Sequence, residues 1–172
     1  MENKSGVKLG GKFITECYDS QGNLKWVDMT HNIITTEGLN RILNVMFAGT
    51  TQIATWYAGL VETNTTATAT MNYDVPIFTE SISYDEATRP AYVEVPSTAG
   101  SLTNAASKAT FTINNTKTMY GAALFSATTK GSHDAGANNV LFSYAVFATS
   151  RAVVAADVIN LTYVVSAADD GA

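Results

Sequence analysis

The sequence contains few of the residues from which metal sites and active sites are usually built. It has one cysteine, Cys17, and two histidines, His31 and His133, in 172 residues. A single cysteine excludes an intrachain disulfide framework, and we expect Cys17 to be a buried structural thiol. Neither histidine has a spacing that would group it with further His, Cys or carboxylate ligands. The sequence therefore predicts no metal and no cofactor.

Long apolar runs and clusters of basic residues are also missing. No segment approaches the roughly 20 consecutive apolar residues of a membrane span, and the polar start of the chain does not resemble a signal peptide. We therefore expect a chain that is made and folded in the cytoplasm, with no membrane partner. Ten basic and 15 acidic side chains give a net charge of −5. Because no Lys/Arg cluster offsets this charge, nucleic acid is not an expected partner.

Motifs of known catalytic chemistry are absent as well. The sequence has no Gly-x-Ser-x-Gly elbow, no Walker loop and no dinucleotide-binding glycine pattern, and Gly10-Gly11 is interpreted only as a flexible pair. The adjacent acids Asp85-Glu86 and Asp169-Asp170 are more typical of solvated charge than of a catalytic pair. We predict no catalytic residues and no enzyme activity. A cytoplasmic hydrolase is the weakest alternative.

Strand patterns, in contrast, are frequent in the second half of the chain. In the segment 156–165, Ile159, Leu161, Tyr163 and Val165 share one parity, which is typical of a strand with one face on a core. Polar turns separate several other short apolar runs. Further strands are predicted at 77–84, 91–95, 110–113, 118–126 and 140–147. This spacing indicates an all-β fold, an antiparallel β-sandwich or jelly-roll-like domain.

The N-terminal part of the chain predicts a hairpin followed by one short helix. Strands at 13–18 and 24–29 flank a turn at 19–23 that contains Asp and Gly. After the N-cap candidates Thr35 and Thr36, apolar residues recur at helical spacing and form one face. The members of this face are Leu39, Ile42, Leu43, Met46 and Phe47.

These patterns divide the chain into three predicted parts. Residues 1–12 are expected to form a flexible N-terminal arm. Residues 13–62 are expected to hold the hairpin and the helix, packed on the main domain or used for docking. Residues 63–172 are expected to form the sandwich, with 62–72 as a polar surface loop or linker.

The run 140–147 is apolar on both parities. Such a strand is either buried on both faces or sealed against a neighbouring subunit. On the second interpretation it predicts a homo-oligomer, most simply a trimer closed by C3 symmetry. The candidate interface residues are Phe142, Tyr144, Val146, Trp56 and Tyr57.

Aromatic residues allow a further interpretation, a flat platform for carbohydrate. They suit a core or a subunit interface equally well, since Trp and Tyr are favoured there too. The residues concerned are Trp26, Trp56, Tyr57, Tyr84, Tyr92 and Tyr120.

Several motifs taken in order resemble a family of small virion proteins of tailed bacteriophages. The resemblance covers most of the chain, from about Gly10 to Val165, and its motifs are structural. They lie at 11–13, 19–26, 31–40, 56–60, 84–90 and 150–154. The family offers no catalytic residues to carry over.

The resemblance implies a capsid decoration or cement protein on the virion exterior, bound to the major capsid protein as an oligomer. Lys4, Lys8 and Lys12 near the N-terminus are the candidate capsid-docking residues. The same segment also fits a frayed terminus. The main alternative function is a tail or fibre component, including a module that binds a host receptor or glycan.

Overall fold

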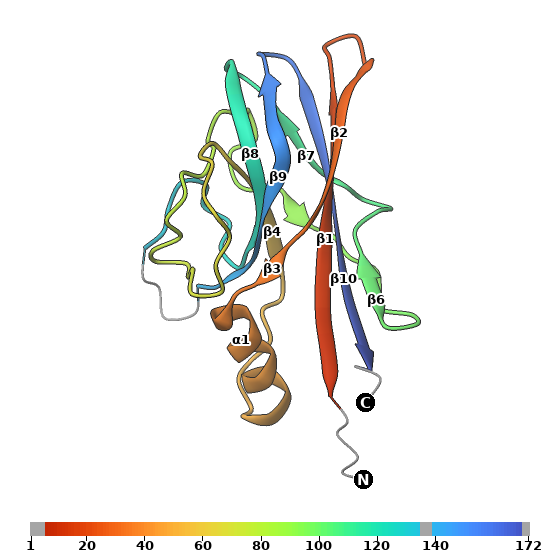
Figure 1. The fold of residues 1–172 in the computed structure, drawn as a ribbon, viewed down its shortest axis with the longest axis vertical. Coiled ribbons are helices and arrows are strands. Elements are labelled where there is room, and N and C mark those ends of the chain that lie inside the picture. The colour runs from red at the N-terminus through yellow and green to blue at the C-terminus, as the bar shows by residue number, and fades with distance from the viewer. Residues whose placement is uncertain (1–5, 135–138, 170–172) are drawn as a thin grey trace.

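In a computed structural model, which describes residues 6–134 and 139–169, the chain forms two antiparallel sheets packed face to face (Figure 1). The first sheet contains β1 (Val7–Tyr18), β2 (Leu24–His31), β6 (Ser101–Thr103), β7 (Ala109–Thr112) and β10 (Val158–Asp169). The second contains β3 (Ile33–Ile34), β4 (Trp56–Val61), β5 (Ala91–Tyr92), β8 (Lys117–Phe125) and β9 (Leu141–Val153). The predicted antiparallel β-sandwich is confirmed.

The two ends of the chain meet in the first sheet. β1 pairs with β10 along its whole length, from Val7 opposite Asp169 to Tyr18 opposite Val158. β2 pairs with the other edge of β1, and Asp19 closes the predicted hairpin by accepting hydrogen bonds from turn amides. β1 therefore crosses the predicted boundary at residue 12, and residues 1–5 of the predicted arm lie outside the described residues. Residues 7–12 are strand instead of arm, and residues 13–62 contribute strands to both sheets.

The main core lies between the sheets. It contains Phe111, Ile113, Leu124, Phe142 and Leu161, all with at most 7% exposure. Val146 and Val165 are half-buried. Cys17 is fully buried in this core, as predicted, and burial raises the pKa of its thiol to about 12.

A second apolar cluster covers the outer face of the second sheet. Met71, Tyr73 and Phe78, from the connection between β4 and β5, pack on Phe125 of β8 and Tyr144 of β9. The predicted strand at 77–84 does not form, because this segment makes only isolated bridges and otherwise follows an irregular path. The predicted surface loop at 62–72 likewise contributes a buried residue. We call the segment 62–90 the cover.

The cover explains why β9 is apolar on both parities. A register irregularity between β8 and β9 beside Phe142 shifts the alternation of side chains, as a β-bulge does. Phe142 consequently enters the core between the sheets, whereas Tyr144 lies under the cover. Both residues are buried within their own chain, so the prediction that they form a subunit interface is wrong.

The predicted helix is present as α1 (Thr36–Phe47), with Thr35 as its N-cap. Gly38 allows the helix to approach β9, because a Cβ there would lie 2.6 Å from the carbonyl oxygen of Phe142. Within the described residues no helix is both long and apolar enough to span a membrane.

Candidate functional site

The outward face of β1 carries two of the lysines that we predicted for docking. Alternate residues of a strand share a face, so Lys8, Gly10 and Lys12 lie together. The register places Lys12 opposite His31 of β2 and Gly10 opposite Ser166 of β10. These five residues line a hollow of about 480 Å³, which we call the basic groove.

The two glycines at this position have different roles. A Cβ on Gly10 would meet only the Oγ of Ser166, at 3.7 Å, so the missing side chain leaves the floor of the groove open. A Cβ on Gly11 would lie 2.6 Å from both the Oδ1 of Asn32 and the hydroxyl of Tyr163. Gly11 is therefore required for close packing, and the interpretation of the pair as merely flexible is wrong.

The lysines of the groove differ from the other described lysines in having no partner. Within residues 6–134 and 139–169, the side chains of Lys8 and Lys12 make no hydrogen bond or ion pair. The other lysines pair with carboxylates or carbonyls, as in Lys25–Asp157, Lys108–Glu16, Lys117–Glu62 and Lys130 with the carbonyl of Tyr84. Two unpaired cations at one place on an acidic chain favour an anionic partner. Lys4, the third predicted lysine, lies outside the described residues.

The remaining predicted interface residues do not form one surface. Trp56 and Tyr57 are adjacent in β4 and therefore point to opposite faces. The ring of Trp56 packs edge-on against Phe142, with 5.2 Å between centroids. Val146 packs on the cluster under the cover. The five predicted interface residues thus do not share one exposed face, since Phe142 and Tyr144 are buried and the others are half-buried.

The predicted aromatic platform is not assembled either. Tyr84 and Tyr92 are buried, with 0% and 3% exposure. Trp26 packs against Phe147 and donates its Nε1–H to the carbonyl of Ala152, at 3.2 Å. Because these three rings pack within the chain, they cannot form one flat exposed surface for a sugar.

Most of the apolar face of α1 points toward solvent, although Ile42 packs against the main core. Leu39, Leu43, Met46 and Phe47 are 39%, 55%, 68% and 82% exposed, respectively, and only Gly38 of the helix is buried. We call these four residues the α1 patch. The sequence predicted the face correctly but gave no sign that the core would leave it uncovered.

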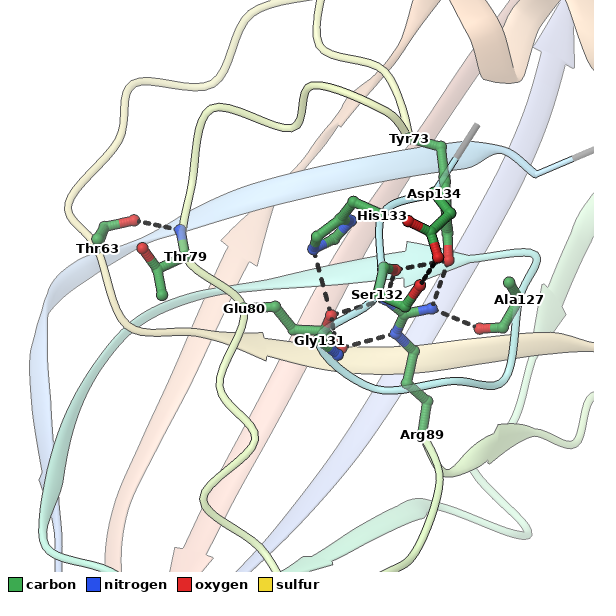
Figure 2. A network of polar contacts seen from close by, with 10 residues as sticks. All are labelled: Thr63, Tyr73, Thr79, Glu80, Arg89, Ala127, Gly131, Ser132, His133 and Asp134. Carbon is green, nitrogen blue, oxygen red and sulfur yellow. Dashed lines mark hydrogen bonds and ion pairs between the residues drawn. The ribbon is translucent and has the colours of Figure 1, made fainter. Parts of the chain in front are cut away.

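A buried polar cluster joins the cover to the loop 127–134 (Figure 2). Arg89 donates from Nε to Oε1 of Glu80, at 2.6 Å, and from Nη2 to Oε2, at 2.7 Å. Its Nη1 donates to the Tyr73 hydroxyl, at 3.2 Å, and to the Ala127 carbonyl, at 2.7 Å. Nη2 also donates to the carbonyl of Ser132, at 3.1 Å. Arg89 is 1% exposed, so the cluster lies out of reach of a ligand in solution.

His133 extends this cluster on the far side of Glu80. Its Nε2 lies 3.4 Å from Oε2 of Glu80, which also accepts a hydrogen bond from the amide of Gly131. Burial lowers the pKa of His133 below its usual value, and Arg89 acts in the same direction, although Glu80 opposes the shift. The imidazole is therefore neutral near pH 7. Since Glu80 uses both oxygens within the protein, the cluster is a structural clamp.

This ion pair was not predicted from the sequence. One signal was available, since Glu80 shares its parity with Phe78 and Tyr84, both of which are buried. An acid among buried apolar residues needs a cationic partner. The sequence could not identify Arg89 as that partner, because the intervening segment has no regular structure.

Comparisons with known proteins add no assignment. The chain matches no protein-family model and no curated protein sequence. In the part of the chain that the structure describes, no three His, Cys, Asp or Glu side chains are grouped so that they could hold a metal ion. The geometry instead defines a two-sheet β protein with two unsatisfied surfaces, the basic groove and the α1 patch.

The ion pair gives a direct test of the clamp. Arg89→Met should lower the free energy of unfolding by about 3 to 5 kcal/mol, because it leaves Glu80 buried without a partner. As a control, Lys108→Met removes an exposed ion pair with Glu16 and should cost less than about 1 kcal/mol. Urea denaturation measures both values. Equal small losses in the two variants would show that Arg89 does not hold the cover.

His133 should make stability depend on pH. Its pKa is below the usual 6.5 in the folded chain, so the unfolded chain takes up the proton first as the pH falls. The free energy of unfolding should therefore decrease below about pH 6.5, and His133→Gln should reduce that slope. His31→Gln, at an exposed histidine outside the cluster, should retain it. A slope unchanged by His133→Gln would contradict this assignment.

Proposed function

We propose that this chain is a structural protein of a tailed-bacteriophage virion, a capsid decoration protein that binds the outside of the capsid lattice as a homotrimer. The observation that carries the proposal is the basic groove, where Lys8 and Lys12 are unpaired on a chain of net charge −5. The partner would be the major capsid protein, contributing carboxylates to the groove.

The arrangement of the two surfaces supports this proposal. The N-terminal half of β1, which carries the basic groove, lies at the same end of the long axis as α1 (Figure 1). One end of the molecule thus offers a cationic surface and an apolar surface together. The outer face of the second sheet, in contrast, is occupied by the cover.

Symmetry makes modest contacts sufficient for stable attachment. A decoration protein meets a repeated lattice, so three copies in one trimer bind together and each contact adds to avidity. A standard interface buries about 800 Å² per partner, and a smaller one suffices when three act at once. A trimer also matches the three-fold positions between hexameric capsid tiles.

Charge reversal in the groove tests the docking proposal. Lys8→Glu/Lys12→Glu should weaken binding to particles that lack the native protein by at least tenfold, because like charges then face the capsid carboxylates. Lys108→Glu/Lys117→Glu changes the net charge equally outside the groove and should bind nearly normally. Cosedimentation with purified particles measures both affinities.

Two outcomes would contradict the proposal. Unchanged binding of Lys8→Glu/Lys12→Glu would exclude the groove as the docking site. Localisation of the labelled protein to tail tips in electron micrographs would instead favour the tail or fibre alternative.

A further inference from the structure

A small apolar hollow lies beside the α1 patch, between α1 and the segment that leads into β4. Its volume is about 210 Å³. The apolar residues that line it are Ile42, Val45, Met46, Ile53, Trp56 and Phe142. The helix therefore presents exposed apolar side chains and an apolar hollow side by side, with Met46 belonging to both.

The helix is anchored mainly through its first turn. The Oγ1 of Thr35 accepts a hydrogen bond from the amide of Gly38, at 3.0 Å. Oε2 of Glu37 accepts hydrogen bonds from the amides of Tyr73 and Leu141, at 2.9 and 2.8 Å. Burial of Glu37 raises the pKa of its carboxyl, although these two amides oppose the shift.

The second half of the helix has much less support from the chain. Helices shorter than about 12 to 15 residues are marginal in water, and most helical stability in proteins comes from packing of an apolar face. In α1, which has 12 residues, Met46 and Phe47 at the C-terminal end are 68% and 82% exposed. Covering this end would stabilise the helix.

The distribution of charge favours a second copy of this chain as the partner that binds the α1 patch. Between Thr36 and Tyr57 the only charged residues are Glu37 and Arg41, and Glu37 is engaged with backbone amides on the inner side. Two copies of a chain with net charge −5 repel one another over most of their surface. The α1 patch is a place where they can meet without opposing carboxylates.

The hollow also has a suitable size for a side chain of the patch. A cavity of about 150 Å³ in a protein core accommodates benzene, and the hollow beside α1 exceeds this volume. Phe47 is the aromatic side chain of the patch and is 82% exposed. Because the hollow and Phe47 lie on the same helix, each copy can both insert a ring and receive one.

We propose that a second copy of this chain covers the α1 patch, with Phe47 of one copy occupying the hollow at Trp56 of the next. Repeated around a three-fold axis, this contact closes a ring. The inference rests on the self-association part of the proposed function and not on attachment to the capsid. It also replaces the late-strand interface, in which Phe142 and Tyr144 are buried.

Sedimentation of the full-length chain over a range of concentrations tests this contact. The unmodified chain should form a homo-oligomer, and Leu43→Gln/Phe47→Gln should raise the dissociation constant at least 30-fold. Leu24→Gln/Val27→Gln removes two comparably exposed apolar side chains, 55% and 43% exposed, from β2 of the first sheet and should leave association unchanged. Far-ultraviolet circular dichroism confirms that each variant retains its β structure.

Tryptophan fluorescence provides a second measurement at the hollow itself. In a Trp26→Phe background the emission comes from Trp56 alone. Its quenching by acrylamide should decrease as association rises with concentration, and Leu43→Gln/Phe47→Gln should abolish that decrease. Quenching that is independent of association would place the interface elsewhere.

The results separate this inference from the proposed function. A chain that remains monomeric at every concentration, or whose association resists Leu43→Gln/Phe47→Gln, overturns the inference, even if it still binds particles through the basic groove. An oligomer that depends on the α1 patch but binds no particles supports the inference and overturns the capsid proposal.

Discussion

The ion pair between Arg89 and Glu80 is the interaction on which the outer half of the structure depends. Both side chains are almost fully buried, and a guanidinium cannot leave its carboxylate there without leaving a charge in apolar surroundings. Both residues belong to the cover, and their hydrogen bonds with Ala127, Gly131 and Ser132 join it to the loop 127–134. The rings of Phe125 and Tyr73, beneath and beside the guanidinium, add cation–π contacts at 4.0 and 5.6 Å.

This clamp determines which surfaces remain for other molecules. With the cover in place, the outer face of β9 is filled by Tyr144 and its neighbours, so the most apolar strand of the chain needs no partner subunit. The second sheet is thereby closed on both sides. Within the described residues, α1 presents four exposed apolar side chains together, and Lys8 and Lys12 of the basic groove have no partner. Both surfaces lie at one end of the molecule (Figure 1).

The parts of the fold that follow local rules were predictable from the sequence. The hairpin at β1 and β2, the N-cap at Thr35 and the alternation in β10 each depend on a few neighbouring residues. The cover was not predictable, because its irregular path is set by contacts with β8 and β9 that are distant in sequence. Phe142 illustrates the limit, since a register irregularity beside it changes which face each later residue of β9 occupies.

The candidate site was predictable only in part, for the same reason. Lys8 and Lys12 were identified as docking residues but assigned to a flexible arm, and they share one face because residues 7–12 form a strand. Their alignment with His31 and Ser166 depends on how β2 and β10 pair with β1. The exposure of the α1 patch depends on where the core ends, and a helical pattern does not contain that information.

Amide hydrogen exchange across the cover tests the central claim that one chain closes both faces of the second sheet. The amides of Glu62, Ser81 and Arg89 donate to the carbonyls of Thr79, Leu60 and Thr128, at 2.8 to 2.9 Å. The account predicts that peptides containing these amides exchange slowly in the native protein, with protection approaching that of β8 and β9. Exchange at the rate of an unstructured peptide would contradict it, since β9 would then have an open apolar face.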